Sequence, residues 1–175
     1  MTNSPVSPTR PLPAVSLRVP TDEDAHAWHR VFADGDVMEF LGGRAELSVY
    51  EELTARQRLH DARHGFCLWT LLDDGGRVIG FTGAQPWPEE KEWGPVGEIE
   101  IGWRLGREYW GRGYATAAAE ATVARVRAAG LPRVCAMVDA RNARSVAVAE
   151  RLGMRLAAEF TTPSGNPARR YELDL

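Results

Sequence analysis

The sequence is poor in cysteine, with only two in 175 residues and no Cys-x-x-Cys pair. Cys67 and Cys135 are far apart, and each lies inside an apolar run. Unpaired cysteines in such runs usually behave as small buried hydrophobic residues. We therefore expect two structural thiols in a reducing compartment, the cytoplasm, and no disulfide framework.

The sequence also lacks a strong charge of either sign and any long apolar run. The formal net charge is -3, which gives no general attraction to polyanions, so we expect neither nucleic acid nor a membrane as a partner. A mildly acidic chain is compatible with a cationic ligand such as an amine. No segment approaches the roughly 18 consecutive apolar residues that a membrane helix requires.

One folding unit is expected from the length and composition. A chain of 175 residues with 44% hydrophobic content can bury a single core. Residues 1–13 are rich in Pro, Ser and Thr and have no apolar stretch of signal-peptide length. We predict a flexible N-terminal tail over 1–13 and one domain over 14–175.

Histidine is scarce, with four in the chain. His60 and His64 are four apart on a predicted helix, but no Glu lies between them as in a zinc-protease helix, and no third ligand is in view. We predict no metal site.

Cap signals, turn signals and apolar periodicity divide the chain into alternating helices and strands. Their order predicts a mixed α/β (α+β) fold, in which a sheet of about seven strands is flanked by helices. The stretch 34–47 is expected to be irregular. The predicted helices are 21–33, 48–64, 114–129 and 145–152, and the predicted strands are 15–19, 66–72, 77–84, 98–105, 133–138, 154–160 and 168–173.

The most informative segment is a glycine turn between a strand and a helix, from Gly106 to Gly113. Unpaired N–H groups at a helix start, approached through residues without a Cβ, suit a phosphate or pyrophosphate. The dinucleotide-binding pattern Gly-x-Gly-x-x-Gly does not match, because its third glycine is replaced by Thr116. The phosphate-binding loop that ends in Lys-Ser/Thr does not match either, because Arg112 stands in place of the lysine. A turn with no ligand is the remaining alternative.

Two sequence blocks resemble the GNAT acyltransferase superfamily, in particular its ribosomal-protein N-terminal acetyltransferase-like branch. The first is Glu108-Tyr109-Trp110-Gly111-Arg112-Gly113-Tyr114-Ala115-Thr116, which is similar to the coenzyme A turn of that branch. The second is Asn142-Ala143-Arg144-Ser145, followed by Glu150-Arg151-Leu152-Gly153-Met154. The blocks occur in the family order, and the resemblance extends over about 15–175.

The resemblance implies a splayed, mostly antiparallel sheet that admits the pantetheine arm of acetyl-CoA between strands 98–105 and 133–138. The chain departs from the family pattern at Glu108, where a Gln or Arg is usual, so Arg107 or Arg112 would supply the missing charge. It departs again at Ala149, where many relatives have a tyrosine that protonates the leaving thiolate. The implied cofactor-binding residues are Trp103, Leu105, Trp110, Gly111, Arg112, Gly113, Tyr114, Ala115, Thr116, Asn142 and Ser145.

Acetyl transfer to an amine requires a base, because an ammonium group has no lone pair with which to attack a thioester. Glu98 and Glu100 are two apart on one strand and project from the same face. Two nearby carboxylates raise the pKa of at least one of them. Glu100 is the predicted base, because it matches the family strand, and Glu98 is the alternate. The competing interpretation is that both carboxylates lie on a solvated face of the strand and have no catalytic role. Ser145 or water would protonate the thiolate, and a backbone N–H near Leu105 would stabilise the oxyanion.

Together these features predict an N-acetyltransferase that moves the acetyl group of acetyl-CoA to a primary amine, either a protein N-terminus or a small molecule. The acceptor would contact the first two helices, the stretch 34–47 and the loop 86–97. A non-catalytic acyl-CoA-binding module is the alternative. Dimerisation is common in the family, so a homodimer is compatible with the resemblance.

Overall fold

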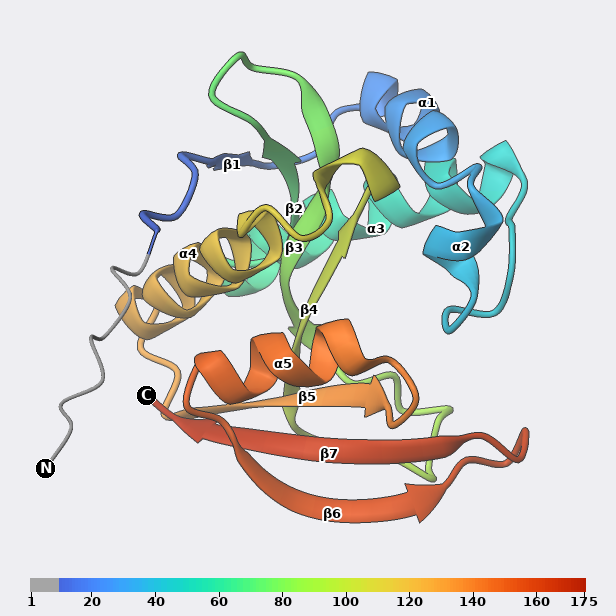
Figure 1. Ribbon diagram of the computed structural model, residues 1–175, viewed down its shortest axis with the longest axis vertical. Coiled ribbons are helices and arrows are strands. Elements are labelled where there is room, and N and C mark those ends of the chain that lie inside the picture. Colours follow the sequence, from blue (N-terminus) through green and yellow to red (C-terminus); the bar gives the residue numbers. More distant parts are fainter. Residues whose placement is uncertain (1–9) are drawn as a thin grey trace, which may run out of the picture.

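The computed structural model describes residues 10–175, so most of the predicted tail, residues 1–9, lies outside the described part. The described chain forms one seven-stranded sheet in the order β1-β2-β3-β4-β5-β7-β6 (Figure 1). Neighbouring strands are antiparallel except for β4 and β5, which are parallel. The strands are β1 (Ser16–Arg18), β2 (Leu68–Leu72), β3 (Val78–Pro86), β4 (Ile99–Leu105), β5 (Arg133–Asp139), β6 (Arg155–Thr161) and β7 (Pro167–Asp174).

Helices cover both faces of the sheet (Figure 1). One cluster of buried side chains joins the first three helices to Leu68 and Phe81 of β2 and β3. A second cluster joins the next helices to the opposite face, where Thr82 contacts Thr122 at 2.8 Å. The helices are α1 (Asp22–Val31), α2 (Gly35–Met38), α3 (Leu47–His64), α4 (Tyr114–Ala128) and α5 (Ala143–Arg151), with a short 3₁₀ turn, η1 (Arg107–Tyr109).

The sheet is divided at its parallel pair. In the described chain, β4 and β5 are paired at a single position, Glu100 with Cys135, whereas β3–β4 and β5–β7 are paired along their lengths. The strands therefore diverge toward Leu105 and Asp139. This confirms the predicted mixed, mostly antiparallel, splayed sheet.

Two local predictions need correction. The stretch 34–47 is not wholly irregular, because the Asp34 carboxylate accepts a hydrogen bond from Asp36 N at 2.8 Å and caps the four-residue helix α2. Such a short helix leaves no periodicity in the sequence to detect. The following helix begins at Leu47 with Glu46 as its N-cap, so Ser48 lies in the first turn and is not the predicted cap.

Candidate active site

Two cavities open where β4 and β5 separate. The larger, about 940 Å³, is bounded by the glycine turn and α5, and we call it the turn cavity. The smaller, about 440 Å³, is bounded by β4 from Glu100 to Arg104 and by α3, and we call it the strand cavity. The two cavities share six lining residues and therefore adjoin. These are Phe40, Leu41, Trp103, Arg104, Asn142 and Ser145.

The glycine turn has the geometry of an anion-binding loop. Gly111 and Gly113 have φ of 68° and 87°, in the left-handed region that favours glycine. The Trp110 indole Nε1 donates to the Leu105 carbonyl at 3.1 Å and so ties the turn to the end of β4. Because Gly113 is the N-cap of α4, the unpaired N–H groups of the first helical turn lie at the edge of the turn cavity.

Most of the predicted cofactor-binding residues line the turn cavity, but Arg112 and Tyr114 do not. The Arg112 guanidinium lies over the Tyr114 ring at 5.4 Å and donates to the Glu108 carbonyl at 3.3 Å. The Tyr114 ring is buried against Tyr109. The residues that do line it are Trp103, Leu105, Trp110, Gly111, Gly113, Ala115, Thr116, Asn142 and Ser145.

The positive charge of the turn cavity comes from different elements than predicted. Arg107 does not supply it, because its guanidinium pairs with Asp36 at 2.6 Å. Instead, Arg10 and Arg104 line the cavity, together with two arginines of α5, Arg144 and Arg151. The α5 arginines are seven apart and share one helix face, and Arg144 stacks on Trp110 at 4.2 Å. The second sequence block contains both arginines at this spacing, but the sequence-based prediction did not include them among the binding residues.

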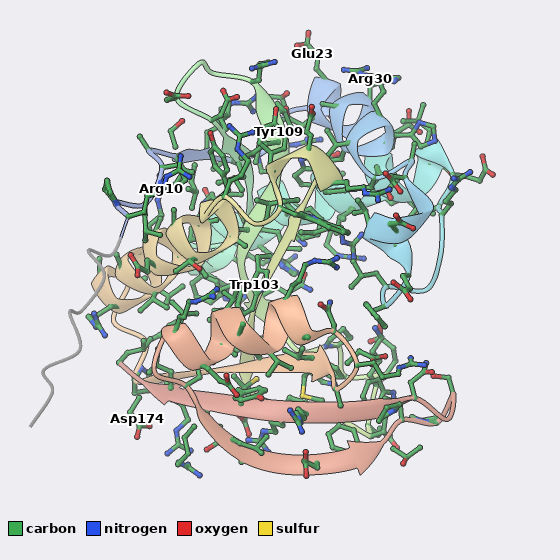
Figure 2. All side chains as sticks on the ribbon, viewed as in Figure 1. Arg10, Glu23, Arg30, Trp103, Tyr109 and Asp174 are labelled. Atoms are coloured by element: carbon green, nitrogen blue, oxygen red, sulfur yellow. The ribbon has the colours of Figure 1, made fainter. Side chains whose placement is uncertain are left out.

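The segment just before β1 also borders the turn cavity. Arg10 and Leu12 line it, and a Cβ at Gly113 would come within 3.2 Å of Leu12 Cδ2 and Pro13 Cδ. Figure 2 shows Arg10 on the side of the molecule where α4 lies, and Trp103 near the centre. Residues 10–13 therefore cover part of the glycine turn.

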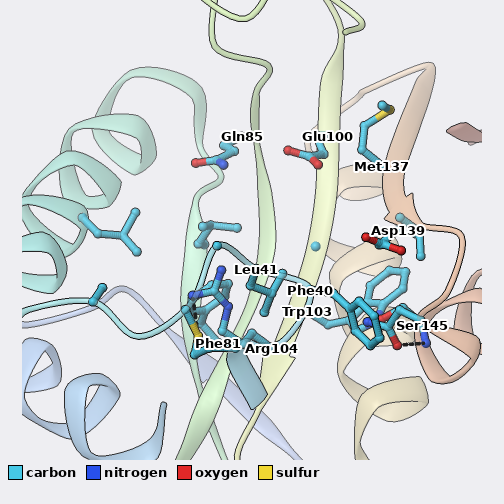
Figure 3. Close-up of a pocket in the computed structure, with 18 of the residues that line it drawn as sticks. Phe40, Leu41, Phe81, Gln85, Glu100, Trp103, Arg104, Met137, Asp139 and Ser145 are labelled. Carbon is cyan, nitrogen blue, oxygen red and sulfur yellow. Dashed lines mark hydrogen bonds between the residues drawn. The ribbon is translucent and has the colours of Figure 1, made fainter. Parts of the chain in front are cut away.

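Glu100 lines the strand cavity at the end where Gln85 and Met137 also lie (Figure 3). Burial raises the pKa of its carboxyl to about 7, although the charge of Lys91 and the Met137 backbone N–H act in the opposite direction. The carboxyl is surrounded by protein but still opens to the cavity, so it can exchange a proton with a bound molecule. Desolvation raises this pKa, and the predicted repulsion from Glu98 does not, because Glu98 is paired with Arg170.

Glu98 has a different environment from Glu100. It precedes β4, and its Oε1 accepts a hydrogen bond from the Arg170 guanidinium at 2.5 Å, in an ion pair with β7. Glu98 lines neither the strand cavity nor the turn cavity. Of the two carboxylates singled out in the sequence, the one that reaches a cavity is therefore Glu100.

Asn142 and Ser145 lie where the two cavities meet. Asn142 is the N-cap of α5, and its side-chain oxygen accepts from Ser145 N at 3.2 Å (Figure 3). This bond fixes the first turn of α5 and turns both residues toward the junction of the cavities. Ala149, at the position where many relatives carry a tyrosine, is fully buried in the core.

Neither cysteine is placed to act as a nucleophile. Both are fully buried, and burial raises the pKa of each thiol to about 12. We expect neither thiol of the native protein to react within minutes with an aromatic disulfide reagent, because the thiolate is the reactive form. Both should react after unfolding in denaturant, measured by absorbance of the released thiolate. Fast labelling of the native protein would contradict this assignment.

Among residues 10–175, no cluster of three or more His, Cys, Asp or Glu could hold a metal ion. His60 and His64 lie edge to face at 5.9 Å, and the His64 ring stacks on Phe66. Within the same residues, no helix is both long and apolar enough to cross a membrane.

Comparison with known proteins agrees with this geometry. The sequence pattern of the acetyltransferase (GNAT) domain matches residues 15–155. YkkB of Bacillus subtilis (strain 168), described as uncharacterized, is 30% identical over 145 residues, which are 80% of this chain and 81% of YkkB.

Solved structures share the fold. A GNAT-family acetyltransferase from Bacillus anthracis superimposes with a TM-score of 0.76 at 23% identity, covering 91% of this chain and 94% of its own. The structure of yncA from Salmonella typhimurium with its cofactor acetyl-CoA superimposes with a TM-score of 0.70 at 14% identity, covering 93% and 94%. The family match spans most of the chain and includes both blocks of the site, so this chain belongs to the GNAT acetyltransferase family.

Proposed function

We propose that this protein is an N-acetyltransferase that transfers the acetyl group of acetyl-CoA directly to a primary amine, with Glu100 as the base. The observation that carries the proposal is that the two cavities adjoin at Trp103, Asn142 and Ser145. The turn cavity suits the phosphates of a coenzyme, and the strand cavity carries a carboxyl with a raised pKa. A thioester and an amine bound in these cavities would meet where β4 and β5 diverge.

The proton of the attacking amine must leave, because an ammonium group cannot attack a carbonyl carbon. Glu100, with a pKa of about 7, can accept this proton, directly or through water. The amine nitrogen then bonds to the acetyl carbon, and the carbon–sulfur bond breaks. The products are an amide and the thiol of coenzyme A, with the proton of the thiol supplied by water or by the Ser145 hydroxyl. A backbone N–H near Leu105 would stabilise the oxyanion.

Support for acetyl-CoA comes from three features of the turn cavity. It has helix N–H groups behind two left-handed glycines, the cations Arg144 and Arg151, and a volume suited to a large cofactor. The yncA structure, which shares the fold, contains acetyl-CoA.

A non-catalytic acyl-CoA-binding module would need the turn cavity but not Glu100. Calorimetric titration with acetyl-CoA, followed by an amine screen read out by released thiol, tests both candidates. Binding with turnover supports the enzyme, and binding with no turnover of any amine supports the binding module. Absence of binding would rule out both.

The raised pKa of Glu100 predicts the pH profile. The carboxylate is the active form, so kcat/KM should rise about tenfold per pH unit below pH 7 and level off above it. Steady-state kinetics between pH 5 and 9 would measure this, with the Glu100→Gln variant as control, since it should lack the inflection. A native profile without an inflection between about pH 6 and 8 would contradict the assignment.

The pH dependence of folding stability tests the pKa of Glu100 without any measurement of turnover. The pKa of Glu100 is higher in the folded protein than in the unfolded chain, so ionisation costs folding free energy. This cost is absent below the pKa that Glu100 has in the unfolded chain. It grows as the pH rises from about 4.5 to about 7, and it is constant above about pH 7. Glu100→Gln should therefore gain stability relative to the native protein across that window, as measured by thermal melting.

A further inference from the structure

Arg104 is a half-buried cation without a carboxylate partner. It lies on β4, opposite Phe81 of β3, and its guanidinium stacks on Phe32 at 5.3 Å and on Phe81 at 5.0 Å. Its Nη1 contacts the Met38 sulfur at 3.7 Å, the Tyr50 hydroxyl lies close by, and its Nε is shielded from solvent and makes no hydrogen bond. Arg104 makes no ion pair with any residue from 10 to 175.

A second unsatisfied polar group faces the same space. The Tyr50 ring is 2% exposed, and its hydroxyl, close enough to Arg104 to interact electrostatically, makes no hydrogen bond of normal geometry with the described residues. Both side chains line the strand cavity. Buried donors are normally satisfied, and an unpaired buried charge is costly. Two such groups in one cavity point to a ligand that supplies the acceptor atoms.

The charge balance of the strand cavity identifies the kind of ligand. Its cations are Arg44, Arg56 and Arg104, and none of them makes an ion pair within the described chain. Its carboxylates are Glu100, which is about half ionised near its pKa of about 7, and Asp139, which is bound to Arg141 at 2.7 Å. The cavity therefore has an excess of positive charge and favours an anion.

The placement of the two groups along β4 gives the ligand an orientation. Glu100 and Arg104 lie on the same face of the strand with Gly102 between them, so their Cα atoms are roughly 13 Å apart. Figure 3 shows Arg104 beside Phe81 and Leu41 at one end of the cavity and Glu100 at the other. A molecule lying along β4 could place an amine toward Glu100 and an anionic group at Arg104.

We propose that the acceptor is a small amine that also carries a carboxylate, and that Arg104, with the Tyr50 hydroxyl, binds this carboxylate. A guanidinium matches a carboxylate through two parallel hydrogen bonds. A cavity of about 440 Å³ is the size of a small-molecule site. The inference rests on the proposed acetyl transfer and names its acceptor class.

The test compares matched pairs of amines that differ only in charge at the far end. Suitable pairs are 4-aminobutyrate with 4-aminobutanamide and 6-aminohexanoate with 6-aminohexanamide. Released thiol gives kcat/KM at saturating acetyl-CoA for the native protein, Arg104→Met and Arg104→Lys. Arg30 on α1 (Figure 2) is exposed and lines neither cavity, so Arg30→Met is the control.

The native protein should prefer at least one carboxylate over its amide by about 30-fold or more. Arg104→Met should remove this preference, with Arg104→Lys intermediate and Arg30→Met unchanged. Arg104→Met should also leave the KM for acetyl-CoA unchanged and raise Tm, by about 2–6 °C, because it replaces an unpaired, half-buried charge with an apolar side chain.

Three results would overturn the inference. One is no preference for the carboxylate in any pair, and another is an equal loss on carboxylates and amides in Arg104→Met. The third is a raised KM for acetyl-CoA in Arg104→Met, which would make Arg104 a cofactor ligand. If the native protein bound no acetyl-CoA in a calorimetric titration, the proposed function itself would fail, and this outcome differs from the three above. Titration of each amino carboxylate into the complex of the protein with coenzyme A measures acceptor binding without turnover.

Discussion

Replacement of Glu100 by glutamine should lower kcat by about 100- to 1,000-fold while the affinity for acetyl-CoA changes less than about twofold. Glutamine has nearly the same size and can occupy the same position near Gln85 and Met137, but it cannot accept a proton from the amine. Positioned general bases contribute about 10²–10⁴ to a rate, which sets the expected range. Initial rates of thiol release at saturating acetyl-CoA and amine would measure the effect.

Glu98→Gln is the matched control for this variant. It removes a carboxylate of the same type two residues away, but one that pairs with Arg170 outside both cavities. We expect a loss of stability and only a small change in kcat. Normal turnover by Glu100→Gln would show that the base assignment is wrong, and a large loss in Glu98→Gln alone would transfer the role to Glu98.

The Gly113→Val variant should bind acetyl-CoA at least about 100-fold more weakly than the native protein, or about 2.7 kcal/mol. Gly113 has φ of 87° and immediately precedes the first N–H groups of α4. A branched side chain there would fill the approach that a phosphate needs, and its Cβ would lie 3.2 Å from Leu12 Cδ2 and Pro13 Cδ. Calorimetric titration with acetyl-CoA would measure the loss.

Gly130→Val is the control that distinguishes the effect of backbone strain from a direct loss of the binding site in Gly113→Val. Gly130 follows the other end of α4 with φ of 83°, and a Cβ there would meet no atom within 4 Å. Both variants should lose a similar amount of stability, of roughly 1–3 kcal/mol, because both force a non-glycine residue into the left-handed region. Native-like affinity in Gly113→Val would mean that the glycine turn does not hold the cofactor.

Much of the fold was predictable because its signals are local. The period-two alternation of β4 places Glu100 and Arg104 on one face, as the structure confirms. The glycine turn and the start of α4 follow from residues that are adjacent in the chain. These features depend on backbone preferences within a few residues.

The parts of the site that were missed depend on contacts between distant segments. The ion pair between Glu98 and Arg170 joins residues 72 apart, and no local pattern indicates it. The sequence can place Arg104 on the polar face of β4, but it cannot show that no carboxylate packs against it. Arg144 is remote in sequence from the glycine turn, and the packing of α5 brings its side chain onto Trp110.

The single pairing between β4 and β5 makes this domain two half-sheets, β1–β4 and β5–β7–β6, with a shared boundary. Each half is paired internally along its strands, so the weakest internal boundary coincides with the place where substrates would bind. A linear molecule lying in that gap would contact both halves and link their unfolding. Cooperativity of the whole domain would then depend on ligand concentration, since a ligand at 100 times its Kd adds about 2.7 kcal/mol to the folded state.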